Sequence, residues 1–165
     1  MAWQRSFKFG PQEESDLTIS ADGRVATKAS GSSYGWTAAF LEPEFSTAGQ
    51  TYQEFVIEEV GFEYHALIGV TSLEAAPAPS THVHMSPKSS LFYCGDSKAY
   101  PGSRLWGPSK QLQKDDKLGL LVDRGSLYIR LNGQPLEQQP MTARLPSRVR
   151  FVVELRSKGS SVRLA

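Results

Sequence analysis

The sequence predicts an all-β fold: an antiparallel sandwich of two sheets with roughly ten to twelve strands. Apolar and polar residues alternate with a period of two along much of the chain, and no window sustains a 3.6-residue apolar period. The 14 glycines and 10 prolines are spread over the whole length, which suits many short strands and turns. A chain of 165 residues can bury one core, so we expect a single domain over 1–165.

The first strands form a hairpin. Residues 17–20 alternate, and Asp22-Gly23 then supplies a tight turn before a return strand that begins at Val25. The longest β-rich run follows, and it places Phe55 on an apolar face. The further strands expected in this half cover 52–60 and 67–71.

The C-terminal half repeats the same pattern. Leu118, Leu120 and Val122 share one face of an alternating run. Asn132-Gly133 ends the next run as a type I′ turn, because both residues tolerate positive φ. The strands expected here cover 91–93, 117–123, 127–131 and 149–155.

Charge and cysteine content exclude several classes of function. Eighteen Lys and Arg against seventeen Asp and Glu leave a net charge of +1, which predicts no binding to nucleic acid or to a membrane surface. Residues 29–87 lack Lys and Arg and residues 141–165 are rich in Arg, so we expect the two regions to pair. The single cysteine, Cys94, fits a reducing compartment. With no signal peptide or membrane-spanning stretch in view, we expect a cytoplasmic protein that is a monomer as an isolated domain.

Several motifs occur in a defined order along this chain. Leu-Gly-x-x-x-Asp at 118–123 is followed by Asn-Gly at 132–133, and this pairing is the most specific element. The others are Gly49, Tyr52, Phe55 and Ile57 in one strand, Ile68-Gly69-Val70 in the next, and Leu91-Phe92-Tyr93 after a long loop. The chain resembles the SPRY domain over about residues 7–164. The related B30.2 form carries a Leu-Asp-Pro motif that is absent here, so a bare SPRY module is the better match. The resemblance implies a two-sheet sandwich that binds partners and catalyses nothing.

Catalytic arrangements are missing from the sequence, and we expect neither an enzyme nor a cofactor. Glu54 and Glu58 share a strand face but stand roughly 13 Å apart, too far for a glycosidase pair. His82 and His84 could begin a zinc site, but a third ligand is lacking within reach apart from Cys94 or Asp96. We therefore expect no metal, and we expect Cys94 to be a buried, unreactive thiol.

Binding is expected on loops at one end of the sandwich. Four loops carry residues that a core does not need: 30–43, the Pro/Ser/Ala-rich 72–90, 97–108 and 156–159. The SPRY resemblance implies a ligand surface that includes counterparts of the first, second and last. Tyr, Trp and Arg are the types most enriched at binding hot spots. The expected partner-binding residues are Tyr34, Trp36, His84, Tyr100, Arg104, Trp106, Arg156, Ser157 and Lys158.

We expect different positions for the two tryptophans in this set. Trp36 either plugs the core or joins the binding surface, whereas Trp106 lies in a less strand-like context and is expected to be exposed.

Three functions fit such a chain. The leading interpretation is a non-catalytic module that binds a short peptide or a partner protein; rings beside Arg156 would suit a peptide with acidic or amide side chains. The alternatives are a lectin-like carbohydrate-binding sandwich, with an aromatic ring stacked on a sugar, and a structural subunit of a larger assembly.

Overall fold

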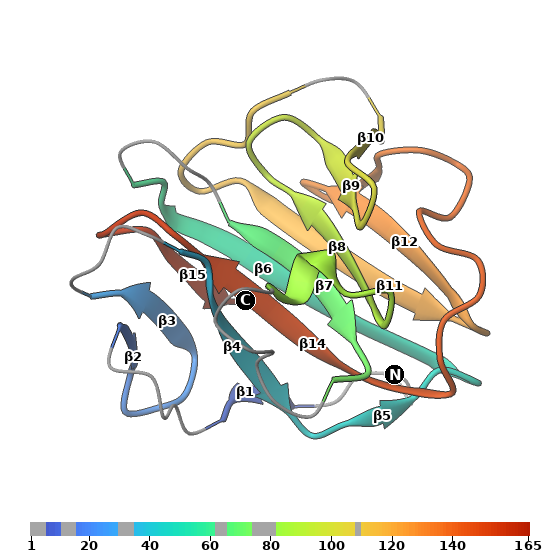
Figure 1. Cartoon of the computed structure of the whole chain (residues 1–165), viewed down its shortest axis with the longest axis horizontal. Helices are drawn as coiled ribbons and strands as arrows, with labels where there is room; N and C mark the ends of the chain where they lie inside the picture. Colours follow the sequence, from blue (N-terminus) through green and yellow to red (C-terminus); the bar gives the residue numbers. More distant parts are fainter. Residues whose placement is uncertain (1–5, 11–15, 30–34, 62–65, 74–81, 108–109) are drawn as a thin grey trace.

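The computed structural model describes residues 6–10, 16–29, 35–61, 66–73, 82–107 and 110–165. Within these ranges the chain forms fifteen strands and one short 3-10 helix, η1 (Val83–Met85), and every strand ladder is antiparallel. The strands form two sheets (Figure 1). This confirms the predicted sandwich. Four of the fifteen strands have only two residues, which is why the count exceeds the prediction.

One sheet has eight strands in the order β1-β4-β14-β7-β8-β9-β10, with β5 also paired to β14. Helix η1 lies over this sheet (Figure 1). Its strands are β1 (Lys8–Phe9), β4 (Thr37–Glu42), β5 (Phe45–Ser46), β7 (Leu67–Thr71), β8 (Ser89–Tyr93), β9 (Lys98–Tyr100), β10 (Arg104–Leu105) and β14 (Arg148–Leu155).

The other sheet has seven strands in the order β13-β12-β11-β6-β15-β3-β2. They are β2 (Leu17–Ile19), β3 (Val25–Lys28), β6 (Gln50–Glu59), β11 (Lys117–Asp123), β12 (Ser126–Leu131), β13 (Gln134–Pro135) and β15 (Ser161–Leu164).

Two of the expected loops contain strands. Residues 37–42 of the segment 30–43 form β4, and much of the segment 97–108 is a hairpin of β9 and β10. β4 pairs with β14, which is remote in sequence, so the local pattern does not reveal it. β9 and β10 have only three and two residues, too few for a visible alternation.

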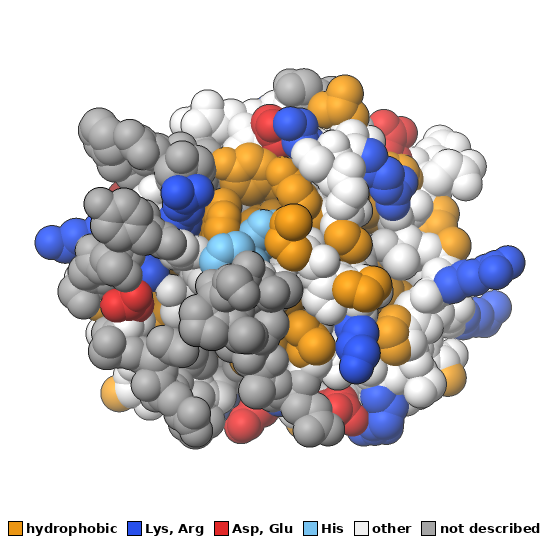
Figure 2. All heavy atoms as spheres, in the orientation of Figure 1, with side chains coloured by type: hydrophobic (Ala, Val, Ile, Leu, Met, Phe, Trp, Pro, Cys, Tyr) orange, Lys and Arg blue, Asp and Glu red, His pale blue; other side chains and the backbone are white. Residues whose placement is uncertain are grey.

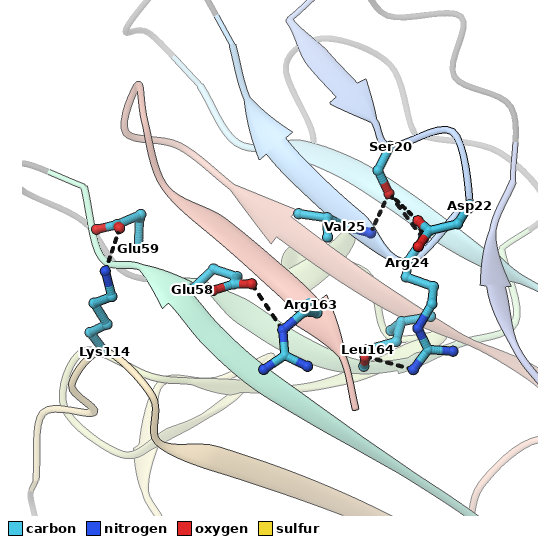
Figure 3. Close-up of polar contacts among 9 residues, drawn as sticks. All are labelled: Ser20, Asp22, Arg24, Val25, Glu58, Glu59, Lys114, Arg163 and Leu164. Carbon is cyan, nitrogen blue, oxygen red and sulfur yellow. Dashed lines mark hydrogen bonds and ion pairs between the residues drawn. The ribbon is translucent and has the colours of Figure 1, made fainter.

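The predicted turns are confirmed by the backbone. Gly23 has a φ of +73° in the turn between β2 and β3, where the Ser20 hydroxyl also accepts the N–H of Val25 (Figure 3). Asn132 and Gly133 both have positive φ, as a two-residue turn between β12 and β13 requires.

The core lies between the two sheets. Phe55 and Ile57 of β6, Leu120 of β11 and Val153 of β14 are at most 2% exposed, as the alternation of their strands predicted. Cys94 follows β8 and is fully buried in this cluster. Burial raises the pKa of its thiol, and Asp116 adds to that shift, so the thiol's lack of reactivity stays a prediction with a physical basis.

Ion pairs connect the acidic and basic regions. Arg148 lies 2.5 Å and Arg150 3.7 Å from Glu44, and Arg163 lies 2.9 Å from Glu58 (Figure 3). The expected pairing of the two regions is therefore present. These pairs are partly exposed, so each adds little to stability.

Candidate functional site

The outer face of the eight-stranded sheet carries a second hydrophobic cluster. Because side chains alternate along a strand, every second residue of β4, β14, β7 and β8 points away from the core. The residues that alternate with them point inward and belong to the hydrophobic core between the two sheets. The buried members of the outer cluster are Ala38, Leu67, Val83, Leu91 and Val152. The outward-facing residues of a sandwich strand are normally polar and exposed to water. A cluster of buried apolar residues on this face is therefore a candidate interaction site.

A buried carboxylate holds η1 on this face. Glu154 is 1% exposed and lies on β14, directly across from Ala38 on β4 and Leu67 on β7. Its Oε1 accepts the His84 backbone N–H at 2.8 Å and contacts His84 Nδ1 at 2.8 Å, and its Oε2 accepts the Val83 N–H at 3.3 Å. The carboxylate therefore satisfies two backbone donors of η1 and orients the imidazole ring.

Four aromatic rings form a closed circuit around this anchor. Trp36 contacts His84, His84 contacts Tyr100, Tyr100 contacts Tyr93, and Tyr93 contacts Trp36. The centroid distances are 5.5, 5.3, 6.3 and 5.9 Å, and neighbouring planes lie 71–89° apart. We call these four residues the aromatic box. Each contact has the edge-to-face geometry that aromatic pairs favour.

The sheet register explains how these rings meet. Tyr93 ends β8 across from Lys98, and Tyr100 ends β9 across from Leu91, so the two tyrosines are diagonal neighbours on one face. Trp36 immediately precedes β4. The side chains of Trp36, Tyr93 and Tyr100 are half-buried, whereas His84 is 7% exposed.

The molecular surface is hollowed at this face. In the orientation of Figure 1, Figure 2 shows histidine side chains at the surface beside a hollow lined by hydrophobic side chains. Met85 of η1 is 59% exposed, one of two large hydrophobic residues that are exposed within the described ranges. The ring of His82 stacks on that of His84, with 5.5 Å between centroids.

Three of the predicted binding residues come together here: Trp36, His84 and Tyr100. The open question on Trp36 is answered, because it packs on the outer cluster and not in the core between the sheets. Tyr34 lies outside the described residues.

Trp106 and Arg104 lie elsewhere. Trp106 was expected to be exposed, but it is half-buried and packs on the inner core together with Leu136. The guanidinium of Arg104 lies over its ring at 5.6 Å and donates to the carbonyl of Met141 at 2.5 Å. The two residues cap the end of the core and are not members of the aromatic box.

The three predicted binding residues of the loop 156–159 also lie in different environments. Leu155, the last residue of β14, pairs with Thr37, the first residue of β4. Arg156 follows Leu155 and Trp36 precedes Thr37, so the two residues lie at the same end of this strand pair. Ser157 is buried, and its carbonyl accepts the backbone N–H and the hydroxyl of Ser160. Lys158 is exposed. Of the three, Arg156 is the one that the register places beside the aromatic box.

Sequence reasoning missed Tyr93 and Glu154 as members of this site. Both had been assigned to strands, and a strand residue gives no sign of which face it occupies until the register is known. One signal was available for Glu154: it interrupts the apolar run of β14 at a position that alternation places outside the core.

Within the described residues, no group of three or more His, Cys, Asp and Glu side chains is placed to hold a metal ion. The described part of the chain also has no helix with the length and apolarity needed to cross a membrane.

Comparison with solved structures defines the fold. The chain matches the SPRY domain of human HERC1 with a TM-score of 0.73 and 14% identity, over 95% of this chain and 96% of that one. It matches the PSpry domain of TRIM65 with a TM-score of 0.73 and 16% identity, over 99% and 91% of the two chains. A human SPRY domain gives a TM-score of 0.67 and 18% identity, over 97% and 96%. No family model and no curated protein matches the sequence.

These likenesses extend over 95–99% of this chain. The protein therefore has the SPRY fold, as the order of its motifs predicted.

Proposed function

We propose that this protein is a non-catalytic interaction module that captures a short peptide or a partner protein on the outer face of the eight-stranded sheet. The observation that carries the proposal is the outer cluster, in which half-buried aromatic side chains surround a ring fixed by a buried carboxylate. Large rigid rings in a partly desolvated setting are the side chains that dominate binding energy at protein interfaces.

The rigidity of this surface supports the proposal. Glu154 fixes η1, and the sheet fixes Tyr93 and Tyr100, so a partner would lose little free energy in ordering the site. Trp36 and Tyr100 offer apolar area with a polar group at the edge, which suits a peptide backbone.

Arg156 gives the surface a second kind of contact. It leaves the sheet beside Trp36, where a guanidinium could form charge-assisted hydrogen bonds with an acidic or amide side chain of the peptide. We place this activity in the cytoplasm and assign it to a single domain, in keeping with the one cysteine and the common core.

The test is capture of partners from cells by the wild-type chain and by two variants. Tyr100→Ala removes a ring of the aromatic box, and Tyr128→Ala removes a half-buried tyrosine from β12 of the other sheet. We expect a protein captured by the wild type to be lost with Tyr100→Ala and kept with Tyr128→Ala. Equal capture by all three chains would contradict the proposed surface.

A further inference from the structure

A buried lysine, Lys28, contacts the chain on both sides of Trp36. Its Nζ donates to Thr37 Oγ1 at 2.6 Å and lies 3.5 Å from the carbonyl oxygen of Gly35. We propose that Lys28 is a positioning residue for partner binding, which acts by fixing Trp36 in the aromatic box. This inference rests on the proposed function and adds a residue that lies outside the binding surface.

Lys28 occupies a position that alternation normally gives to an apolar residue. Ala26 and Lys28 are the two buried residues of β3, so both side chains point into the space between the sheets. Lys28 is only 1% exposed. Lysine is almost never buried to this degree unless its ammonium group is paired, because the charge loses its hydration. The partners of this ammonium group therefore deserve a functional explanation.

The partners divide into a charged one and two that flank Trp36. Asp16, which precedes β2, places Oδ2 3.4 Å from Nζ, and its backbone carbonyl accepts the N–H of Ala29 at 2.8 Å. Asp16 thus compensates the charge from the side of the seven-stranded sheet. The contact with Thr37 is the shortest, and hydrogen bonds from an ionised donor are the stronger ones.

Lys28 joins the two sheets at the end where Trp36 and Arg156 lie. It belongs to β3 of the seven-stranded sheet, whereas Thr37 is the first residue of β4 in the eight-stranded sheet. The backbone N–H of Lys28 donates to the carbonyl of Ser160 at 2.9 Å, and its carbonyl accepts the N–H of Gly159 at 2.8 Å. One residue therefore contacts the segment that enters β4 and the segment that follows Arg156.

The energetics suggest that the ammonium group serves position more than stability. A buried ion pair often adds no net stability over apolar residues of similar volume. An apolar side chain would fill the same space without selecting where Gly35 and Thr37 lie. A fixed Trp36 ring costs a partner little free energy of ordering. If the ring took this placement only about a tenth of the time without Lys28, binding would weaken about tenfold.

The first test asks whether Lys28 fixes Trp36. Lys28→Met keeps an unbranched side chain and removes the ammonium group. Val162→Ala is the control, because Val162 lies across from Ala26, is 1% exposed and belongs to the core between the sheets. The readout is the nuclear Overhauser contacts between the rings of Trp36 and His84, whose centroids lie 5.5 Å apart. We expect Lys28→Met to lose these contacts and Val162→Ala to keep them. Retained contacts in Lys28→Met would overturn the inference.

The second test follows the cell-extract proteins that the wild type captures and Tyr100→Ala loses. We expect Lys28→Met to capture about tenfold less of them and Val162→Ala to capture as much as the wild type, at a temperature where each chain stays folded. Equal losses in the two variants would make Lys28 an ordinary stabilising residue and overturn the inference. Unchanged capture by Tyr100→Ala would contradict the proposed function itself, and the ring contacts would still show whether Lys28 fixes Trp36.

A change on the acceptor side keeps the inference testable even if Lys28→Met does not fold. Thr37→Val nearly keeps the shape of the side chain and removes the hydroxyl that Lys28 contacts. We expect it to weaken both the Trp36–His84 contacts and the capture. The double variant is expected to lose no more than Lys28→Met alone, because both changes break the same hydrogen bond. Losses that add in the double variant would overturn the role assigned to this bond.

Discussion

At the scale of single residues, the outer surface depends on Glu154. Two backbone N–H groups and one ring nitrogen of η1 contact its carboxylate at distances of 2.8–3.3 Å. Hydrogen bonds to a charged acceptor are the stronger ones, and a buried donor that loses its acceptor carries the full cost of desolvation. The side chain is thus a positioning element for His84.

Glu154→Ala is expected to lower the free energy of unfolding by about 1–3 kcal/mol, because it leaves the buried N–H groups of Val83 and His84 without an acceptor. Glu154→Gln is expected to cost less, since its amide oxygen can still accept. Urea unfolding gives both values, and hydrogen exchange at the His84 amide reports whether η1 detaches. Equal losses in the two variants would mean that packing, not hydrogen bonding, holds η1.

Tyr52 supplies a pH-dependent contribution to stability. Burial raises the pKa of its phenol from 10.0 to about 12, and the nearby Glu54 carboxylate, 3.2 Å from the hydroxyl, adds to the shift, while Arg130 over the ring opposes it. The neutral phenol is therefore favoured in the folded state. Its contribution is fully present below pH 10 and is lost as the pH rises toward 12.

We expect the wild-type chain to lose more stability than Tyr52→Phe between pH 10 and pH 12, because the variant has no phenol to ionise at this position. Thermal unfolding at a series of pH values in both chains measures the difference. Parallel curves over this window would show that the phenol has the same pKa in the folded and unfolded states.

At the scale of elements, local sequence predicts most of this fold. The turn at Asn132-Gly133 and the strand at 117–123 depend on neighbours in the chain, and both were predicted at the observed positions. The aromatic box could not be predicted in this way. Trp36, His84 and Tyr100 were proposed as binding residues, but Glu154 reaches His84 across 70 positions, and such a contact becomes visible only with the register.

The Leu-Gly-Leu pattern of β11 is explained by contact with the neighbouring strand β6. Gly119 lies across from Glu54 on β6, and the ring of Tyr52 covers the place where a Cβ would stand. A side chain at 119 would overlap the Tyr52 hydroxyl and ring. The glycine is therefore required by its cross-strand neighbour and not by its own φ.

Gly119→Ala is expected to destabilise the protein by about 1–3 kcal/mol, as overpacking against a ring does. In the Tyr52→Ala background the same change is expected to cost far less, because the overlapping ring is gone. Unfolding free energies of the wild type, both single variants and the double variant form the cycle. If the losses of unfolding free energy in the two single variants add up to the loss in the double variant, the side chain at position 119 does not overlap the Tyr52 ring.

At the scale of the whole molecule, the eight-stranded sheet serves two purposes. Its inner side contributes to the core, where Phe151 and Val153 are fully buried, and its outer side carries the aromatic box. Trp106 belongs to the first set and Tyr100 to the second, although they lie six positions apart in one hairpin region. Stability and binding should therefore respond to different residues.

This separation gives the last prediction. Trp106→Ala is expected to lower the unfolding free energy by about 2 kcal/mol or more, because a half-buried indole leaves the end of the core, and to leave partner capture by the folded chain unchanged. Tyr100→Ala is expected to weaken capture by about 1 kcal/mol or more, and to cost less stability than Trp106→Ala. Calorimetric binding at a temperature where both variants remain folded, with urea unfolding of each, gives the four values. If folded Trp106→Ala binds the partner more weakly, the partner surface extends to the β9–β10 hairpin. If Tyr100→Ala loses more stability than Trp106→Ala, the outer cluster serves to stabilise the fold as the core does.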